Sequence, residues 1–172
     1  ITGTPAVGKK LTASPGTWDM DGLTFSYQWL RDGQPIEGAT ATTYKVVGAD
    51  RGTSLSVRVT AAAEGRPSGV ADSAPVFVKF GSSTKVTVSP YIGSSAASFA
   101  VTVAVTPTGG AAATGEVALW VNGAKYSGTL ADGKVTIPLP KQSRGVKVVV
   151  AQYAGSDTVE GSTGLSGFIV LR

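Results

Sequence analysis

The chain has 172 residues, a formal net charge of +4, and neither histidine nor cysteine. Without these residues it lacks the commonest general base, the usual zinc and haem ligands and the thiol nucleophile, and it cannot form disulfides. Its basic residues are scattered, and no apolar run approaches the ~20 residues that span a bilayer. We therefore expect no nucleic-acid partner, no cofactor, no metal and no membrane insertion.

The pattern of the first half predicts short strands separated by turns. Runs rich in Val, Thr and aromatic residues are bounded there by Gly and Pro, which are typical of turns. Within the central strand of the first half, over 23–31, Phe25, Tyr27 and Trp29 lie on one face by period-two alternation. The expected strands cover 7–13, 23–31, 42–46, 54–62 and 72–80.

The strand pattern restarts after a short stretch at 80–83. Asn122-Gly123 and Asp132-Gly133 are hairpin-turn signals. The expected strands cover 84–89, 98–106, 116–121, 134–139, 146–153 and 165–171, and with the partner strand of the first hairpin they make a sandwich of about seven strands. We therefore predict two domains, 1–79 and 80–172, joined by a short linker in a semi-extended rod.

One motif in the first half is typical of a particular sandwich. Trp29 lies in mid-strand, a turn follows at Asp32-Gly33, and Asp50-x-Gly52 leads into the alternating run 55–59. This order is the inner framework of an immunoglobulin-type β-sandwich. The predicted fold class is therefore all-β, with two Ig-like Greek-key sandwiches in tandem.

The same motif predicts the core of the first domain. In immunoglobulin domains the mid-strand Trp packs against a disulfide that joins the two sheets. We expect Trp29 and Tyr27 to be structural core residues, with Leu11 and Val57 filling the place of the disulfide.

A longer series of residues covers nearly all of 1–79. It reads Pro5-x-Val7-Gly8-x-x-Leu11-Thr12, Pro15-Gly16-Thr17-Trp18, Tyr27-Gln28-Trp29-Leu30-Arg31-Asp32-Gly33, Ile36-x-Gly38-Ala39-Thr40, Tyr44, Asp50-x-Gly52 and Val57-x-Val59-Thr60. In this series the first half resembles an actinobacterial-type Ig-like repeat, which is common in secreted proteins of high-GC Gram-positive bacteria.

The second half carries a different series. It reads Thr84-x-Val86-x-Val88, Val105-Thr106-Pro107, Gly115-x-Val117, Val121-Asn122-Gly123, Leu130-x-Asp132-Gly133-Lys134 and Tyr153-x-Gly155-x-Asp157. In it the second half resembles a group 3 bacterial Ig-like domain, with Val159 where that family often has an aromatic residue. The two resemblances imply spacer or presentation modules beside catalytic domains or in surface adhesins.

Trp120 is the candidate ligand contact. Val117, Leu119 and Val121 alternate toward the core, so Trp120 is expected on the opposite face, whereas Tyr126 shares the inward parity of Leu130. An outward Trp has three explanations: it packs on the first domain, it pairs with a cross-strand neighbour, or it is a platform for a ligand.

Other candidate sites have structural explanations that we favour. Trp18 ends a turn, where it either caps the sandwich or stacks on a sugar, and Asp50 is expected to anchor its corner by hydrogen bonds to the backbone. Asp19 and Asp21 share a loop but lack the third carboxylate of a Ca²⁺ site. The late-loop pair Asp157 and Glu160 is equally incomplete.

No nucleophile–base pair and no pair of carboxylates in a cleft is evident, so we predict that the chain is not an enzyme. We expect a monomeric, non-catalytic spacer or presentation region of a secreted or cell-wall-associated bacterial protein, whose partners are the neighbouring domains of the same polypeptide. The alternative is an accessory module that binds a polysaccharide or a surface protein. We also expect the chain to be an excised part of a longer protein, with any export signal upstream, because its first residues lack the basic and apolar regions of a signal peptide.

Overall fold

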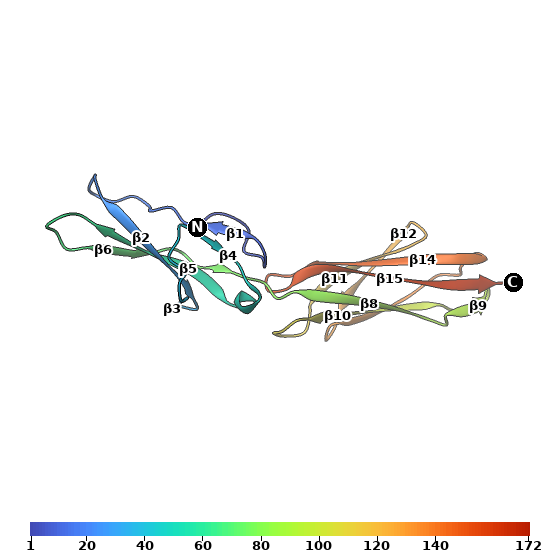
Figure 1. The fold of residues 1–172 in the computed structure, drawn as a ribbon. Helices are drawn as coiled ribbons and strands as arrows, with labels where there is room; N and C mark the ends of the chain where they lie inside the picture. Colours follow the sequence, from blue (N-terminus) through green and yellow to red (C-terminus); the bar gives the residue numbers. More distant parts are fainter. The chain divides into compact units, whose positions relative to one another are not determined.

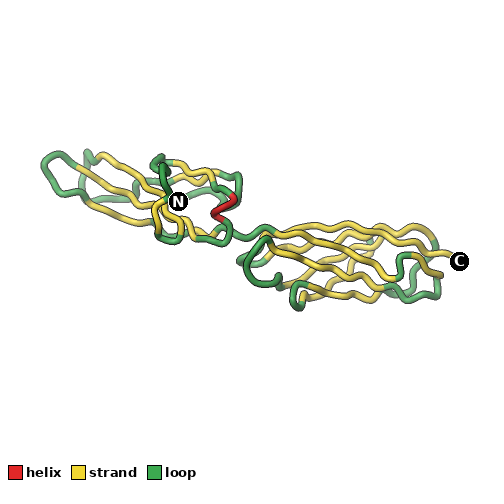
Figure 2. The backbone as a smooth tube through the Cα atoms, turned by 60° about the horizontal axis from the view of Figure 1, so that its bottom comes forward, coloured by secondary structure: helices red, strands yellow, loops and turns green.

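The computed structural model describes residues 1–172, and its regular structure consists of fifteen β-strands and one 3₁₀ turn. The chain divides into two compact units, Ile1–Lys79 and Phe80–Arg172. Strands form the sheets of each unit, and loops connect the strands at their ends (Figures 1 and 2). No helix is long and apolar enough to span a bilayer.

The first unit contains seven strands in two sheets. Its larger sheet has the order β3-β2-β5-β6, with β7 also paired to β5, and β1 pairs with β4 in the smaller sheet. Every pairing is antiparallel. The strands are β1 (Lys10–Thr12), β2 (Thr24–Arg31), β3 (Gln34–Pro35), β4 (Thr43–Lys45), β5 (Ser54–Ala62), β6 (Gly69–Asp72) and β7 (Val76–Phe77).

The core of the first unit surrounds Trp29. Leu11, Trp29 and Val57 are buried, and the partly buried Tyr27 packs against them. The indole N–H of Trp29 donates a hydrogen bond to the Ala41 carbonyl over 2.9 Å. Its ring stacks on that of Tyr44, with 5.5 Å between the centroids. Apolar packing therefore holds the two sheets together in a unit that has no disulfide.

The second unit contains eight strands. One sheet has the order β13-β10-β8 and the other β12-β11-β14-β15-β9. The chain changes sheets after β8, through the cis Ser89–Pro90 peptide, and β9 then pairs parallel with β15. The strands are β8 (Ser82–Ser89), β9 (Ile92–Ser94), β10 (Ala100–Pro107), β11 (Gly115–Val121), β12 (Ala124–Leu130), β13 (Lys134–Pro138), β14 (Gly145–Gly155) and β15 (Glu160–Leu171).

Both units have Greek-key connections. The centre of each larger sheet joins strands that are not consecutive, β2 with β5 and β11 with β14. A strand that lies between them in sequence, β4 or β13, pairs in the opposite sheet. This crossing from sheet to sheet is that of immunoglobulin-like sandwiches. The predicted all-β, Ig-like Greek-key fold class is confirmed.

The core of the second unit is almost wholly apolar. Val101, Val103 and Val105 are buried on one face of β10, and Phe99 is buried just before the strand, as their alternation predicts. The ring of Phe168 in β15 contacts that of Phe99 in the loop before β10, with 4.6 Å between the ring centroids. The hairpin turns also form as predicted, because Asn122 and Asp132 adopt φ values of 46° and 49°.

Two expected strands of the first unit are wrong in their bounds. The strand expected over 72–80 begins at Gly69 and is interrupted after Asp72. There Ser73 accepts a hydrogen bond from the Val57 amide through its side chain, and Pro75 has no amide hydrogen for the ladder. The strand expected over 7–13 shrinks to β1 because a turn at 6–9 precedes it, closed by the Lys9 amide on the Ala6 carbonyl.

In the second unit, the last strand begins five residues earlier than the expected start at 165, at Glu160. The glycines that resemble a loop in sequence are required there by close packing. An added Cβ would lie 2.5 Å from the Thr84 carbonyl oxygen at Gly164 and 2.7 Å from the Tyr153 carbonyl oxygen at Gly161. The short strand β9 is absent from the sequence prediction.

The chain passes between the two units within three residues. Val78 is fully buried in the first unit, and its amide donates to the Thr53 carbonyl over 2.9 Å. Phe80 belongs to the second unit, where its amide donates to the Thr158 carbonyl over 2.9 Å. Lys79 is the one residue between these two hydrogen-bonded positions.

Candidate functional site

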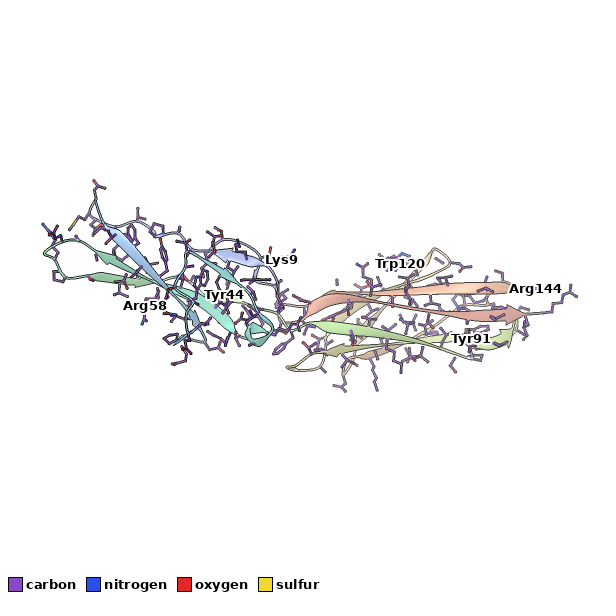
Figure 3. All side chains as sticks on the ribbon, in the orientation of Figure 1. Lys9, Tyr44, Arg58, Tyr91, Trp120 and Arg144 are labelled. Carbon is purple, nitrogen blue, oxygen red and sulfur yellow. The ribbon has the colours of Figure 1, made fainter.

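Trp120 lies on the outward side of the larger sheet of the second unit (Figure 3). Val117, Leu119 and Val121 are buried beneath β11, whereas Trp120 is half-buried. Tyr126 packs against the core from the neighbouring strand. The predicted directions of Trp120 and Tyr126 are therefore confirmed.

Four strands place Trp120 in a continuous row. The strand register sets Lys125, Trp120, Val150 and Leu165 side by side across β12, β11, β14 and β15. The ammonium of Lys125 lies 5.8 Å from the centroid of the indole ring, within the range of a cation–π contact. Of the three explanations for an outward Trp, the structure shows the cross-strand neighbour.

The sheet around this row exposes aliphatic side chains. Val146 and Val148 of β14 and Leu165 of β15 are 68%, 55% and 72% exposed, and Ile92 of β9 is 51% exposed. We call the outward side chains of β11, β14, β15 and β9 the outer face. Burial of such aliphatic groups is favourable, so the outer face can bind an apolar surface.

One end of the outer face is more polar. Glu116, Ala118, Lys125, Gln152 and Ala154 line a shallow hollow of about 210 Å³ beside the row. Trp120 is the one tryptophan of the second unit. Tyr126, Tyr153, Phe99 and Phe168 are packed in or against the core. Tyr91 is 61% exposed, but it precedes β9, which lies three strands away from β11 at the other edge of the sheet. This geometry offers a sugar ring a single aromatic wall, which is a poor platform for a polysaccharide.

The first unit contains a polar cluster that sequence analysis identified only in part. Asp50 is fully buried and accepts hydrogen bonds from the Val47 amide at 2.7 Å and from the Arg31 guanidinium at 2.8 Å. The hydroxyl of Tyr44 donates to the same carboxylate over 3.0 Å. The expected backbone anchor is thus confirmed, but Arg31 and Tyr44 lie on other strands and no local pattern points to them.

Two side chains of this cluster have shifted pKa values. The hydrogen bond to Asp50 raises the pKa of Arg31 above its ordinary value. Burial, together with the hydrogen bond to Asp50, raises the pKa of Tyr44. Both shifts favour the protonated forms of Arg31 and Tyr44, which are the forms that donate hydrogen bonds to Asp50.

Trp18 occupies the loop end of the first unit. Its indole N–H donates to the Pro15 carbonyl over 2.8 Å, and its ring lies 6.1 Å from that of Phe25, centroid to centroid. Gly69 lies directly beside the ring, where an added Cβ would be 2.8 Å from Cζ3. These contacts support the capping role.

The acidic loop residues do not assemble into a cation site. Asp19 and Asp21 are exposed, and so is Asp157, whereas Glu160 is half-buried at the start of β15. No three acidic side chains of the chain converge.

Among the basic residues, sequence analysis missed Lys147, which is buried on the inward side of β14 and donates to Ser143 Oγ over 2.8 Å. Its parity with the buried Val149 would have indicated this position.

The chain is similar to several solved structures of Ig-like and fibronectin-III-like domains. A bacterial ice-binding adhesin of 1.5 MDa matches with 17% identity over 90% of this chain and 55% of its own, at a TM-score of 0.40. Fibronectin(III)-like modules of Clostridium thermocellum CbhA match with 14% identity over 96% of this chain and 87% of theirs, at 0.39. The amphioxus IgVJ-C2 molecule matches with 11% identity over 94% and 95% of the two chains, at 0.46.

These likenesses are of architecture and extend to no ligand or activity. The chain spans about half the length of the adhesin chain and of the mouse nectin-like molecule 4 ectodomain that it also matches. No family model matches the chain, and no curated relative does.

Proposed function

We propose that the chain is a non-catalytic Ig-like spacer region of a secreted or cell-surface bacterial protein, which positions a neighbouring catalytic or adhesive domain. The observation that supports this role is the joint at Lys79. Hydrogen bonds fix Val78 within the first sandwich and Phe80 within the second, so the joint between these two positions is one residue long. A joint this short suits a semi-rigid spacer rather than a flexible tether.

The proposal includes the finer assignment of the two units. The first is an actinobacterial-type Ig-like repeat, and the second is a group 3 bacterial Ig-like domain. The residue series that runs through 1–79 supports the first assignment, and the Val121-Asn122-Gly123 and Asp132-Gly133 turns support the second.

Small-angle scattering tests the spacer role. A compact single domain of this length has a radius of gyration near ~16 Å. A spacer is expected to exceed that value clearly, because two sandwiches in series are longer than one globule. A variant with Gly-Ser-Gly-Ser inserted after Lys79 is the matched control. A native radius near the compact value would contradict the proposal.

A second candidate function is the binding of a protein surface. The exposed Val146, Val148 and Leu165 on the outer face favour it, because the sandwich itself does not need apolar side chains on its solvent side. The expected occupant is an apolar face of a neighbouring domain or of another surface protein. Cross-linking of the full-length protein, compared with that of the double variant Leu165→Ser with Val148→Thr, tests this function. The native protein should form a cross-linked contact through the outer face, and the double variant should lose it.

A further inference from the structure

The loop end of the first unit contains a pocket that the spacer role does not use. Two loops form it, the one that leads into β2 and the one that joins β5 to β6, and Figure 1 shows both at the same end of the unit. The pocket has a volume of about 200 Å³. Its lining residues are Trp18, Asp19, Met20, Leu23, Ala61, Ala63, Arg66, Pro67 and Gly69.

The aromatic wall of this pocket is fixed before any ligand arrives. The hydrogen bond from Trp18 to the Pro15 carbonyl holds the indole, and Phe25 supports it from the side. Gly69 allows the ring to approach the start of β6, since any larger residue would collide with Cζ3. A fixed ring reduces the entropy lost on binding.

The polar groups at the rim are of opposite charge and face the pocket without partners. Arg66 and Asp19 are exposed, and neither takes part in the two ion pairs of the chain, Arg31–Asp50 and Arg58–Asp72. A carboxylate only accepts hydrogen bonds and a guanidinium only donates them. An anionic ligand would meet the charge of Asp19, and a cationic ligand that of Arg66. A neutral group with several hydroxyls satisfies both, because each hydroxyl donates and accepts.

The size of the pocket restricts the ligand further. A cavity of about 150 Å³ accommodates benzene. The present pocket therefore has room for one six-membered ring with its substituents. We propose that the loop end of the first unit binds one neutral pyranose ring, such as a terminal sugar of a glycan. The grounds are the fixed indole, the apolar lining, the two unpaired rim charges of opposite sign and the volume of the pocket. The site is separate from the joint and from Trp120.

Nuclear magnetic resonance titration of the whole 172-residue chain tests this site. The probes are methyl glucopyranoside, methyl galactopyranoside and methyl mannopyranoside, with benzoate as an anionic ring of similar size. At least one pyranoside is expected to shift the Trp18 indole N–H and the Gly69 amide saturably, with a dissociation constant on the order of millimolar for so small a ligand. The Trp120 indole signal should not move.

Two conservative variants show whether the rim residues act as inferred. Asp19→Asn keeps the shape of the side chain, and Arg66→Gln keeps part of its aliphatic stem and an N–H donor. Each should weaken binding about threefold to tenfold, the range of one ordinary hydrogen bond. Asp21→Asn, in the same loop but outside the pocket lining, and Arg51→Gln, outside both pocket loops, are matched exposed controls that should leave the affinity unchanged.

Three results would overturn the inference. The first is the absence of saturable shifts at about 100 mM of every pyranoside, far above the millimolar range expected for one ring. The second is unchanged affinity in both Asp19→Asn and Arg66→Gln. The third is tighter binding of benzoate than of every pyranoside, which would make the pocket an anion site. None of these results would affect the spacer role, which depends on the short joint between Val78 and Phe80.

Discussion

The two units have the same sandwich architecture but differ in chemistry on the solvent side of the larger sheet. In the first unit that side is mostly polar, and Arg58 and Asp72 pair across β5 and β6 through two hydrogen bonds of 2.8 Å. Its exposed apolar side chains are Val70 and Phe77. In the second unit the corresponding side is the outer face, with Val148 and Leu165 exposed. The fold alone therefore does not require the apolar outer face, which makes it the part of the second unit most suited to a partner.

The units also differ in how their interiors are fixed. The first unit combines a Trp29-centred core with the buried carboxylate of Asp50. The second unit relies on a larger apolar cluster, in which Tyr153 fixes its hydroxyl on the Thr114 carbonyl over 3.0 Å. The same sandwich architecture is therefore stabilised in the first unit by a charged corner beside the core, and in the second unit by aromatic and aliphatic packing.

The largest expected effect separates the two cores. Trp29→Ala removes a fully buried indole and should destabilise the first unit by ~3–5 kcal/mol. Because the second unit has its own core, it should remain folded. Hydrogen–deuterium exchange of peptides from each unit measures this, with Phe168→Ala as the reciprocal control. Equal loss of protection in both units would show that they do not fold independently.

The next effect concerns the charged corner. Asp50→Ala removes the acceptor of Arg31, Tyr44 and the Val47 amide, and should cost the first unit about 2–4 kcal/mol in denaturant unfolding. Asp72→Ala is the matched control, because it breaks an exposed ion pair and should cost less than about 1 kcal/mol. Similar losses in both variants would remove the distinction between the corner and the surface pair.

Alkaline pH should weaken the first unit selectively. The folded pKa of Tyr44 is raised, so its contribution is complete below the unfolded value near ~10 and is lost as the pH rises through the folded pKa. Thermal unfolding followed between neutral pH and pH values above ~10 should show this loss. Tyr44→Phe should reduce the pH dependence, and an unchanged profile in that variant would assign the effect to another group.

The smallest effect on stability is expected at the outer face. Leu165→Ser with Val148→Thr should change the stability of the second unit by less than about 0.5–1 kcal/mol, since both side chains are already in water. The same variant should lower the binding of a hydrophobic dye. If the double variant unfolds the unit, the outer face is part of its packing and not a free surface.

Sequence patterns predict this fold well where strands alternate and poorly where they do not. The expected strand over 54–62 coincides with β5, because its inward and outward residues alternate throughout. The start of β15 is missed because glycines replace side chains where its backbone lies against β8. In β14, the run Val148-Val149-Val150 is apolar on both sides of the strand, which hides the outer face from a sequence reading.

The candidate sites are predictable to a similar extent. Strand parity is enough to place Trp120 outward. Its row with Lys125, Val150 and Leu165 depends on strand register, which one sequence does not specify. The corner around Asp50 likewise brings together residues up to nineteen positions apart. The pocket beside Trp18 depends on two loops whose meeting has no local signal.

Distance measurement across the joint at Lys79 tests the spacer account most directly. Since the chain has no cysteine, Ser26→Cys in β2 and Ser127→Cys in β12 provide two unique, exposed positions for spin labels. The account predicts a narrow distance distribution for the native joint and a clearly broader one after insertion of Gly-Ser-Gly-Ser behind Lys79. Equally broad distributions for the two proteins would contradict it, because the native joint would then be as free as a flexible linker.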